Sequence, residues 1–336
     1  MTAAVDLPPT RPQEAVRRSG LLGRLFAEYG QEIVVLAAIV VLFVVVTLVN
    51  PRFVSANNLT TIFSGNAYIA VAAIGMSMVI VTGNIDVSVG ALIGVLATIS
   101  GTLAVSGYPV WFAWLAPILA GMAINAVIGI LVAYARIPSI VVTLGALSIL
   151  RGGLISVTGG TWISGLPPDF LLAQKRLLGL PVPFVAMVVL TVLAFLWMRY
   201  SAFGRSLYAI GGNAEAALAT GIPIERRIVA VFMIHGAFAG LATILFATQL
   251  QVIQSTVPPN LELTVITASV IGGVSILGGS GTVIGSTLAT VLFAAIGSAL
   301  IFINVSAYWL RAVIGLLILA TVLADMIRRR ARGTAA

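Results

Sequence analysis

Two long stretches of the chain contain no charged residue, and this feature constrains the fold more than any other. No Asp, Glu, Lys or Arg occurs from residue 87 to 135 or from 263 to 310. A membrane-spanning helix needs about 20 apolar residues, so each stretch is long enough for two such helices. Only 8% of all residues are charged, whereas soluble domains carry about 25%. The sequence therefore predicts an all-α integral membrane protein.

Apolar runs separated by proline, glycine and asparagine predict about ten transmembrane helices. The predicted spans are 33–50, 59–82, 88–106, 111–134, 139–157, 182–199, 228–250, 263–276, 283–303 and 308–327. They make up a single transmembrane domain over residues 29–330. A cytoplasmic tail over residues 1–28, rich in proline and arginine, is expected to be disordered. An error of one hairpin would give eight spans with the termini on the same sides.

Five spans that start from the inside, followed by five that start from the outside, would form an inverted repeat. Many transporters have this construction, with interrupted helices at matching places in the two halves. Glycine-rich segments at 82–90 and 272–281 are the candidate interruptions. Their places in the two halves match only loosely, so the pattern allows the 5+5 repeat without requiring it.

The positions of the 18 basic residues predict the orientation of the chain. With the N-terminus inside, the cytoplasmic set is Arg11, Arg17, Arg18, Arg24, Arg136, Arg199, Arg205, Arg226, Arg227, Arg328, Arg329, Arg330 and Arg332. Only Arg52, Lys175 and Arg176 fall outside. Because Lys and Arg gather on the cytoplasmic side of membrane proteins, we expect both termini in the cytoplasm. Basic residues placed beside apolar runs also argue against a nucleic-acid partner.

The segment Gly83-Asn84-Ile85-Asp86-Val87-Ser88-Val89-Gly90 is the strongest local candidate for a functional site. Asp86 and Ser88 can accept hydrogen bonds from free N–H groups at the start of the third span. Non-helical backbone at membrane depth survives only when it is buried in protein or lines a cavity. Asn84, Asp86 and Ser88 therefore either belong to the solute pathway or its gate, or form a helix cap without ligand contact.

Arg151 and Arg311 fall within the fifth and tenth predicted spans. A buried arginine is costly unless it is paired or lies in a water-filled cavity, and its guanidinium suits hydroxyl-rich or anionic solutes. Each arginine therefore either lines the pathway or extends to water at the nearer membrane surface. An ion pair between Arg151 and Asp86 is a further option.

Residues 204–227 form the longest predicted cytoplasmic loop and contain a candidate coupling element. Asn213 is a suitable N-cap for a short helix, Glu215 suits its first turn, and Gly221 suits its C-terminal end. Such a compact helix either docks on a partner protein or serves as an ordinary connection between two spans.

Several motifs of enzymes and metal sites are absent from the sequence. It has no Gly-x-x-x-x-Gly-Lys-Ser/Thr phosphate loop, so any ATP hydrolysis must come from another chain. It has no cysteine and no nucleophile–base set, and its one histidine, His235, stands without a second metal ligand. His235 is expected instead to pack between helices beside Gly236 and Gly240. We therefore expect neither an enzyme nor a bound metal or cofactor.

The motifs together resemble those of the ribose-type family of bacterial ABC sugar-importer permeases, over about residues 30–327. Residues 83–90 are similar to the family signature Gly-Gly-Ile-Asp-Leu-Ser-Val-Gly, with Asn84 in place of the second glycine and Val87 in place of leucine. The other similar blocks are 137–145 with 151–152, 204–205 with 209–213, and 272–273 with 278–279. Within the family, residues 84–90 and 158–167 look nearest to permeases for autoinducer-2 or rhamnose.

The resemblance implies a permease subunit of the bacterial inner membrane that carries a monosaccharide or related small polar solute. In ABC importers a loop motif Glu-Ala-Ala-x-x-x-Gly contacts the ATPase, and Glu215, Ala216, Ala217 and Gly221 match it here. The implied partners are separate ATP-binding subunits, a periplasmic or lipoprotein solute-binding protein, and a second permease chain, identical or related. The alternative is an ion-coupled secondary transporter of a small polar solute, which would need several acidic or polar coupling residues at the membrane midplane.

Overall fold

The computed structural model describes residues 21–256, 258, 260–306, 308–317, 319 and 323, with side chains from residue 29 onward. The long helices are α2 (Leu21–Val49), α4 (Ala67–Val81), α5 (Val89–Val105), α6 (Val110–Ala133), α7 (Ser139–Thr158), α8 (Val182–Tyr200), α11 (Ile224–Ala247) and α13 (Val283–Phe302). The shorter ones are α3 (Ala56–Gly65), α9 (Ala202–Gly212), α10 (Ala214–Ala219) and α12 (Leu261–Ile271). Of the tail predicted over residues 1–28, residues 1–20 lie outside the described residues. Residues 21–28 form the start of α2.

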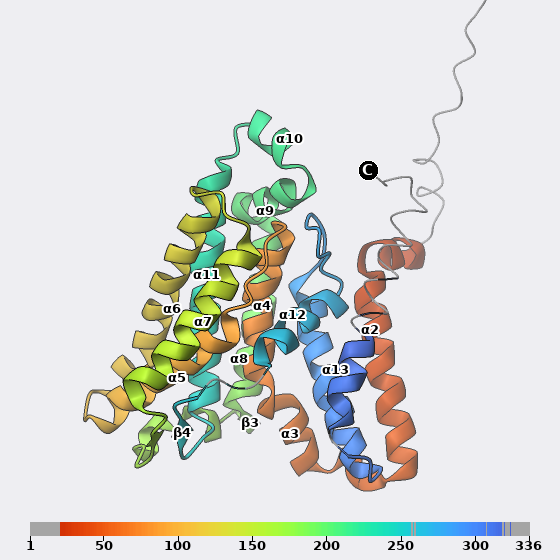
Figure 1. Ribbon diagram of the computed structural model, residues 1–336. Coiled ribbons are helices and arrows are strands. Elements are labelled where there is room, and N and C mark those ends of the chain that lie inside the picture. The colour runs from red at the N-terminus through yellow and green to blue at the C-terminus, as the bar shows by residue number, and fades with distance from the viewer. Residues whose placement is uncertain are drawn as a thin grey trace, which may run out of the picture.

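The remaining elements are single turns and two short strand pairs. The 3-10 turns are η1 (Pro51–Val54), η2 (Pro168–Phe170) and η3 (Leu172–Gln174). The antiparallel pairs are β1 (Trp162–Ile163) with β4 (Ile253–Gln254), and β2 (Arg176–Leu177) with β3 (Leu180–Pro181). All four strands lie at the end of the bundle opposite α9 and α10 (Figure 1).

Seven helices of the described chain are long and apolar enough to cross a membrane. They are Tyr29–Val49 within α2, Ala56–Val81 over α3 and α4 together, and the five helices α6, α7, α8, α11 and α13. The shorter apolar helices α5 and α12 occupy the predicted spans 88–106 and 263–276. The last predicted span, 308–327, lies partly outside the described residues, and its residues 309–317 are helical. The all-α membrane fold agrees with the prediction, while the count of ten and the inverted repeat stay predictions.

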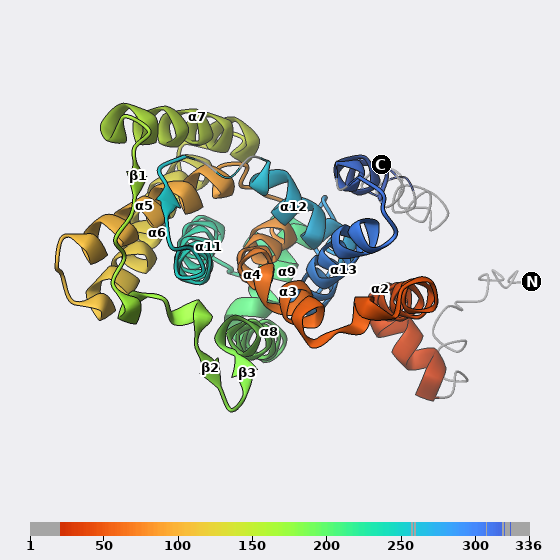
Figure 2. The ribbon, with the colours of Figure 1, turned by 90° about the horizontal axis from the view of Figure 1, so that it is seen from below.

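The helices divide into a buried centre and an apolar outer layer. Every residue of α4 except Tyr68 is buried, and Figure 2 shows α4 and α11 near the middle of the bundle with α2, α7 and α8 at its edges. The outer helices expose large apolar side chains, among them Val40, Leu119, Ile149 and Leu193. Helices that are apolar on all sides belong either in a protein core or in lipid, and these two groups occupy both places.

Close packing at the centre depends on glycines. A Cβ added to Gly236 of α11 would lie 2.1 Å from the backbone oxygen of Gly121 in α6, and one added to Gly240 would lie 2.5 Å from the Cα of Ile118. The predicted packing seam at Gly236 and Gly240 is therefore confirmed. Small residues of this kind let helix backbones approach closely in membrane proteins.

Candidate functional site

The break between α4 and α5 brings Asp86 into the protein interior. Its side chain is fully buried, and Oδ1 accepts hydrogen bonds from the Ser88 backbone N–H at 2.7 Å and the Ser88 hydroxyl at 2.5 Å. Asp86 thus caps the turn before α5, which is one of the two interpretations that the sequence leaves open. Ser88 precedes α5 but makes no cap bond to it with its side chain, because its hydroxyl donates to Asp86 instead.

The second carboxylate oxygen of Asp86 faces His235. Asp86 Oδ2 lies 3.4 Å from His235 Nε2, and both side chains are fully buried. His235 lies midway along α11, one of the helices long and apolar enough to cross a membrane. The suggested ion pair between Asp86 and Arg151 is therefore wrong, and His235 does more than fill space between helices. The sequence offered one weak signal: the only histidine and the acid of the glycine-rich motif are both surrounded by apolar residues.

Side chains from α7 and from the loop itself fix the backbone around Asp86. The Ile85 N–H donates to Ser139 Oγ at 3.2 Å, and the Thr143 hydroxyl donates to the Ile85 carbonyl at 3.4 Å. The Asn84 amide donates to Thr82 Oγ1 at 3.0 Å, so it closes the turn locally. The family block at 137–145 thus has a physical role here: two of its hydroxyls hold the loop against α7.

Arg151 pairs with Glu262, a residue that sequence reasoning missed. Arg151 Nη2 lies 3.6 Å from Glu262 Oε1, with side-chain exposures of 45% and 9%. Glu262 reaches this place because position 90 is glycine: a Cβ on Gly90 would lie 2.3 Å from Glu262 Oε2. The carboxylate therefore lies against the first turn of α5, where the helix dipole favours negative charge. Its one sequence signal is its position directly before the charge-free stretch that begins at residue 263.

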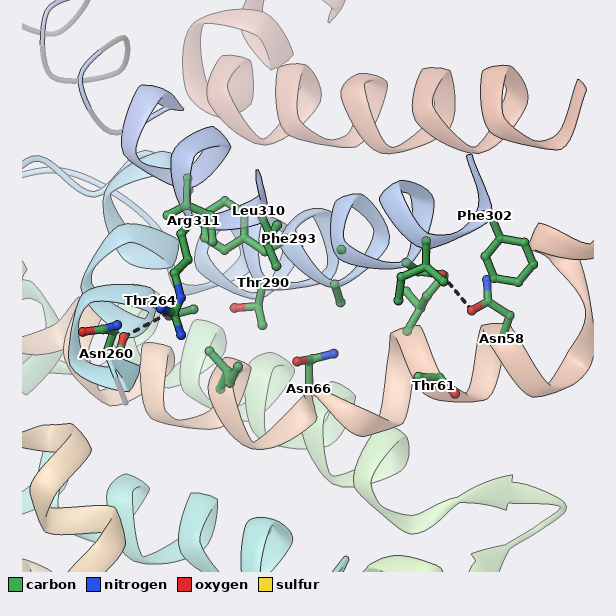
Figure 3. Close-up of a pocket in the computed structure, with 17 residues that line it drawn as sticks. Asn58, Thr61, Asn66, Asn260, Thr264, Thr290, Phe293, Phe302, Leu310 and Arg311 are labelled. Atoms are coloured by element: carbon green, nitrogen blue, oxygen red, sulfur yellow. Dashed lines mark hydrogen bonds between the residues drawn. The ribbon is translucent and has the colours of Figure 1, made fainter. Parts of the chain in front are cut away.

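Arg311 lines a pocket of about 390 Å³ between α3, α4, α12, α13 and the helix over residues 309–317. Its polar lining residues are Asn58, Thr61, Asn66, Asn260, Thr264, Thr290, Ser298 and Arg311. Figure 3 shows Arg311 extending toward Asn260 and Thr264, with Phe293 beside them. The structure thus separates the two arginines of the sequence prediction: Arg151 is paired on α7, and Arg311 lies at this pocket.

Only some of the polar groups in the pocket are already bonded within the protein. Asn58 accepts a hydrogen bond from the Ser298 hydroxyl at 2.7 Å and donates one to the Phe53 carbonyl at 2.7 Å. Within the described part of the chain, the side-chain amides of Asn66 and Asn260 and the guanidinium of Arg311 have no such partner. These three groups are available to a polar molecule in the pocket.

The second interrupted segment, residues 272–282, lies against the first. The Gly279 N–H donates to the Val81 carbonyl at 2.9 Å, and a Cβ on Gly278 would lie 2.8 Å from the Gly83 backbone nitrogen. Deeper in the bundle, a buried hydroxyl cluster joins α4, α12 and α13: Ser77 Oγ lies 2.6 Å from Ser286 Oγ and 3.1 Å from Ser269 Oγ. The two helix breaks therefore form one packed unit.

The predicted coupling element is the short helix α10. The Asn213 side chain accepts from the Ala216 N–H at 2.9 Å, Glu215 lies exposed in the first turn, and Gly221 follows the helix with φ +83°. The local geometry of the N-cap and of the terminal glycine is as the sequence predicts. Figure 1 shows α10 projecting beyond the ends of the long helices, where another protein can reach it.

Comparisons with known proteins agree on one class of protein. The chain matches, over residues 58–322, the model of a family described as "Branched-chain amino acid transport system / permease component". It is 36% identical over 302 residues to the autoinducer 2 import system permease protein LsrC of Escherichia coli (strain K12 / DH10B), covering 89% of this chain and 88% of that protein. The LsrC protein of Salmonella typhi is 37% identical over 301 residues, covering 89% of this chain and 87% of its own. No solved structure matches the chain.

Proposed function

Since this chain belongs to the permease-component family of branched-chain amino acid transport systems, we propose that it is the membrane-spanning subunit of an ABC importer. In this proposal it carries a small hydroxyl-rich solute of the ribose, rhamnose or autoinducer-2 class and makes or breaks no covalent bond itself. The observation that supports it best is α10, an exposed, capped helix whose Glu215, Ala216, Ala217 and Gly221 match the ATPase-contacting motif of ABC importers. ATP would be hydrolysed by separate subunits docked on this helix.

We infer the partners from three exposed surfaces that other proteins would cover. α10 would receive an ATPase subunit, and the opposite end, with the strand pairs, would receive a solute-binding protein. α7 carries Arg151 with 45% of its side chain exposed, although a charged group facing lipid is costly. A second permease chain, packed on this face of α7, would cover Arg151 and complete the pathway between the two chains.

The pocket around Arg311 supports a sugar-like solute over a branched-chain amino acid. The amides of Asn66 and Asn260 and the guanidinium of Arg311 match hydroxyl groups, and Phe293 offers an apolar face beside them. None of the described lining residues is acidic, so the ammonium group of an amino acid would have no counter-charge. Relatives named as autoinducer 2 import permeases point the same way. In this proposal Asn84, Asp86 and Ser88 would not contact the solute. They would fix the loop that is held by α7 beside the pathway.

Uptake into proteoliposomes tests this function. Permease purified from its own membrane with the subunits that accompany it would be given autoinducer-2, D-ribose, L-rhamnose or L-leucine, together with the binding protein. We expect uptake of a sugar-like solute that requires hydrolysable ATP and survives a protonophore and a sodium ionophore. Uptake driven by a proton or sodium gradient without ATP would instead establish the ion-coupled secondary transporter.

The proposed orientation predicts the labelling of two single cysteines, which is simple to test because the chain has none of its own. Leu178, in the turn between β2 and β3, is 96% exposed, and Leu218, in α10, is 59% exposed. In right-side-out vesicles a membrane-impermeant maleimide should label Leu178→Cys and not Leu218→Cys. In inverted vesicles the order should reverse. Labelling of both cysteines from the same side would contradict the assignment of α10 to the cytoplasm.

A further inference from the structure

Helix α9 contacts the end of α4 and the turn between α12 and α13. Only Asn213 separates it from α10. A Cβ on Gly211 would lie 1.8 Å from the Val81 carbonyl oxygen and 2.6 Å from the Gly279 backbone nitrogen. Position 211 must therefore be glycine for α9 to lie this close to both backbones. The neighbouring Gly212 differs, since a Cβ there would meet nothing within 4 Å.

A side chain of α9 adds a second contact at the same place. The Tyr208 hydroxyl donates to the Gly281 carbonyl at 2.8 Å, and the Gly279 N–H donates to the Val81 carbonyl at 2.9 Å. Burial, and then the negative charge of Glu32, raise the pKa of the Tyr208 phenol, so it keeps its proton and remains a donor. Val81, Tyr208, Gly211, Gly279 and Gly281 are called the junction below.

The far side of the same turn is attached to α2. The Gln31 side-chain amide donates to the Ile271 carbonyl at 3.1 Å, at the end of α12. The Thr282 hydroxyl, at the start of α13, donates to the Glu32 carboxylate. Ile271 and Thr282, which flank the turn, are thus bonded to α2, while Gly279 and Gly281 within it are bonded to α4 and α9. A displacement of α9 relative to α2 must therefore move or distort this segment.

We propose that the junction transmits the movement of α10 to both interrupted helix pairs, with Tyr208 and Gly211 as its positioning residues. This inference rests on the proposed function of α10 as the ATPase docking helix. α9 and α10 are joined at a single residue, so a displacement of α10 reaches Val81, five residues before Asp86, and the turn between α12 and α13 together. Interrupted helices packed backbone to backbone shift between discrete arrangements more readily than they deform continuously.

Two matched glycine substitutions and one hydroxyl deletion test the proposal in the intact complex with its ATPase subunits. Gly211→Ala and Gly212→Ala add the same methyl group to adjacent positions of α9, and only the first meets the junction. For Gly211→Ala we expect normal ATPase association and about a tenfold drop in solute imported per ATP hydrolysed. For Tyr208→Phe we expect about a threefold drop in this ratio, from the loss of one hydrogen bond. Gly212→Ala should match the parent protein.

The outcomes separate transmission from docking and from folding. If Gly211→Ala does not accumulate in the membrane, Tyr208→Phe decides, because it removes one hydroxyl without adding volume. An unchanged ratio of import to hydrolysis in Tyr208→Phe would then overturn the proposal. Loss of ATPase association in these variants would also overturn it, since the junction would then act in docking. A parent complex without any ATPase subunit would instead contradict the proposed function itself.

Discussion

Solute uptake should fall about tenfold or more in Glu215→Arg and in Gly221→Val, while the permease stays folded in the membrane. Glu215 is exposed in the first turn of α10, so reversing its charge places a cation where the helix dipole opposes it. It also changes the surface that, in the proposed function, docks on the ATPase. Gly221 has φ +83°, and a side chain there costs about 1–2 kcal/mol and reorients the helix end. Both changes lie outside the bundle core. The measurements are uptake, ATPase co-purification and permease abundance.

The opposite end of the protein supplies matched controls for both substitutions. Gly107 also has φ +83° and open space around its Cβ position, so Gly107→Val brings the same backbone strain far from α10. Asp169 is an exposed acid in the first turn of η2, so Asp169→Arg repeats the charge reversal. Both controls should co-purify with normal amounts of ATPase. Normal association and uptake in Glu215→Arg and Gly221→Val would reduce α10 to an ordinary connection and remove the main support for an ABC permease.

The features that were predicted correctly from the sequence are those determined by residues close together in the chain. Asn213 and Gly221 enclose a helix of six residues, and each signals its own local geometry through capping and positive φ. The seam at Gly236 and Gly240 follows from small residues spaced one helical turn apart. The resemblance to ribose-type ABC permeases, based on such local motifs, is confirmed by the relatives.

The partners of the charged residues could not be predicted, because they depend on helix packing across the chain. Arg151 and Glu262 come from α7 and α12, and Asp86 and His235 come from a loop and from α11. α12 has 11 residues, fewer than the roughly 20 that a span requires. When a helix is apolar on all sides, its sequence does not indicate which face packs against the protein. Their neighbours, and whether they cross the membrane or end inside the bundle, therefore stay hidden.

The buried pair of Asp86 and His235 gives the largest expected effect on stability. Asp86→Ala removes the acceptor of two Ser88 hydrogen bonds and leaves His235 facing an empty site. Each buried donor of Ser88 that loses its acceptor costs about 1–3 kcal/mol of the free energy of unfolding. Asp86→Asn should cost less, because its amide oxygen still accepts from Ser88. Unfolding by SDS in mixed micelles measures these differences, and uptake by Asp86→Ala should be lost with the loop geometry.

A double substitution tells whether His235 is a true partner of Asp86. If the two side chains stabilise each other, His235→Leu removes a polar group that Asp86→Ala would leave unpaired. The pair Asp86→Ala, His235→Leu should then be more stable than the sum of the single losses, by about 1–3 kcal/mol. Part of the loss must remain, since the Ser88 N–H and hydroxyl still lack their acceptor. Strictly additive losses would mean that Asp86 acts only as the cap of the turn before α5, with His235 a neighbour by packing alone. A positive coupling would mean that α11 holds the glycine-rich loop in place through one buried contact.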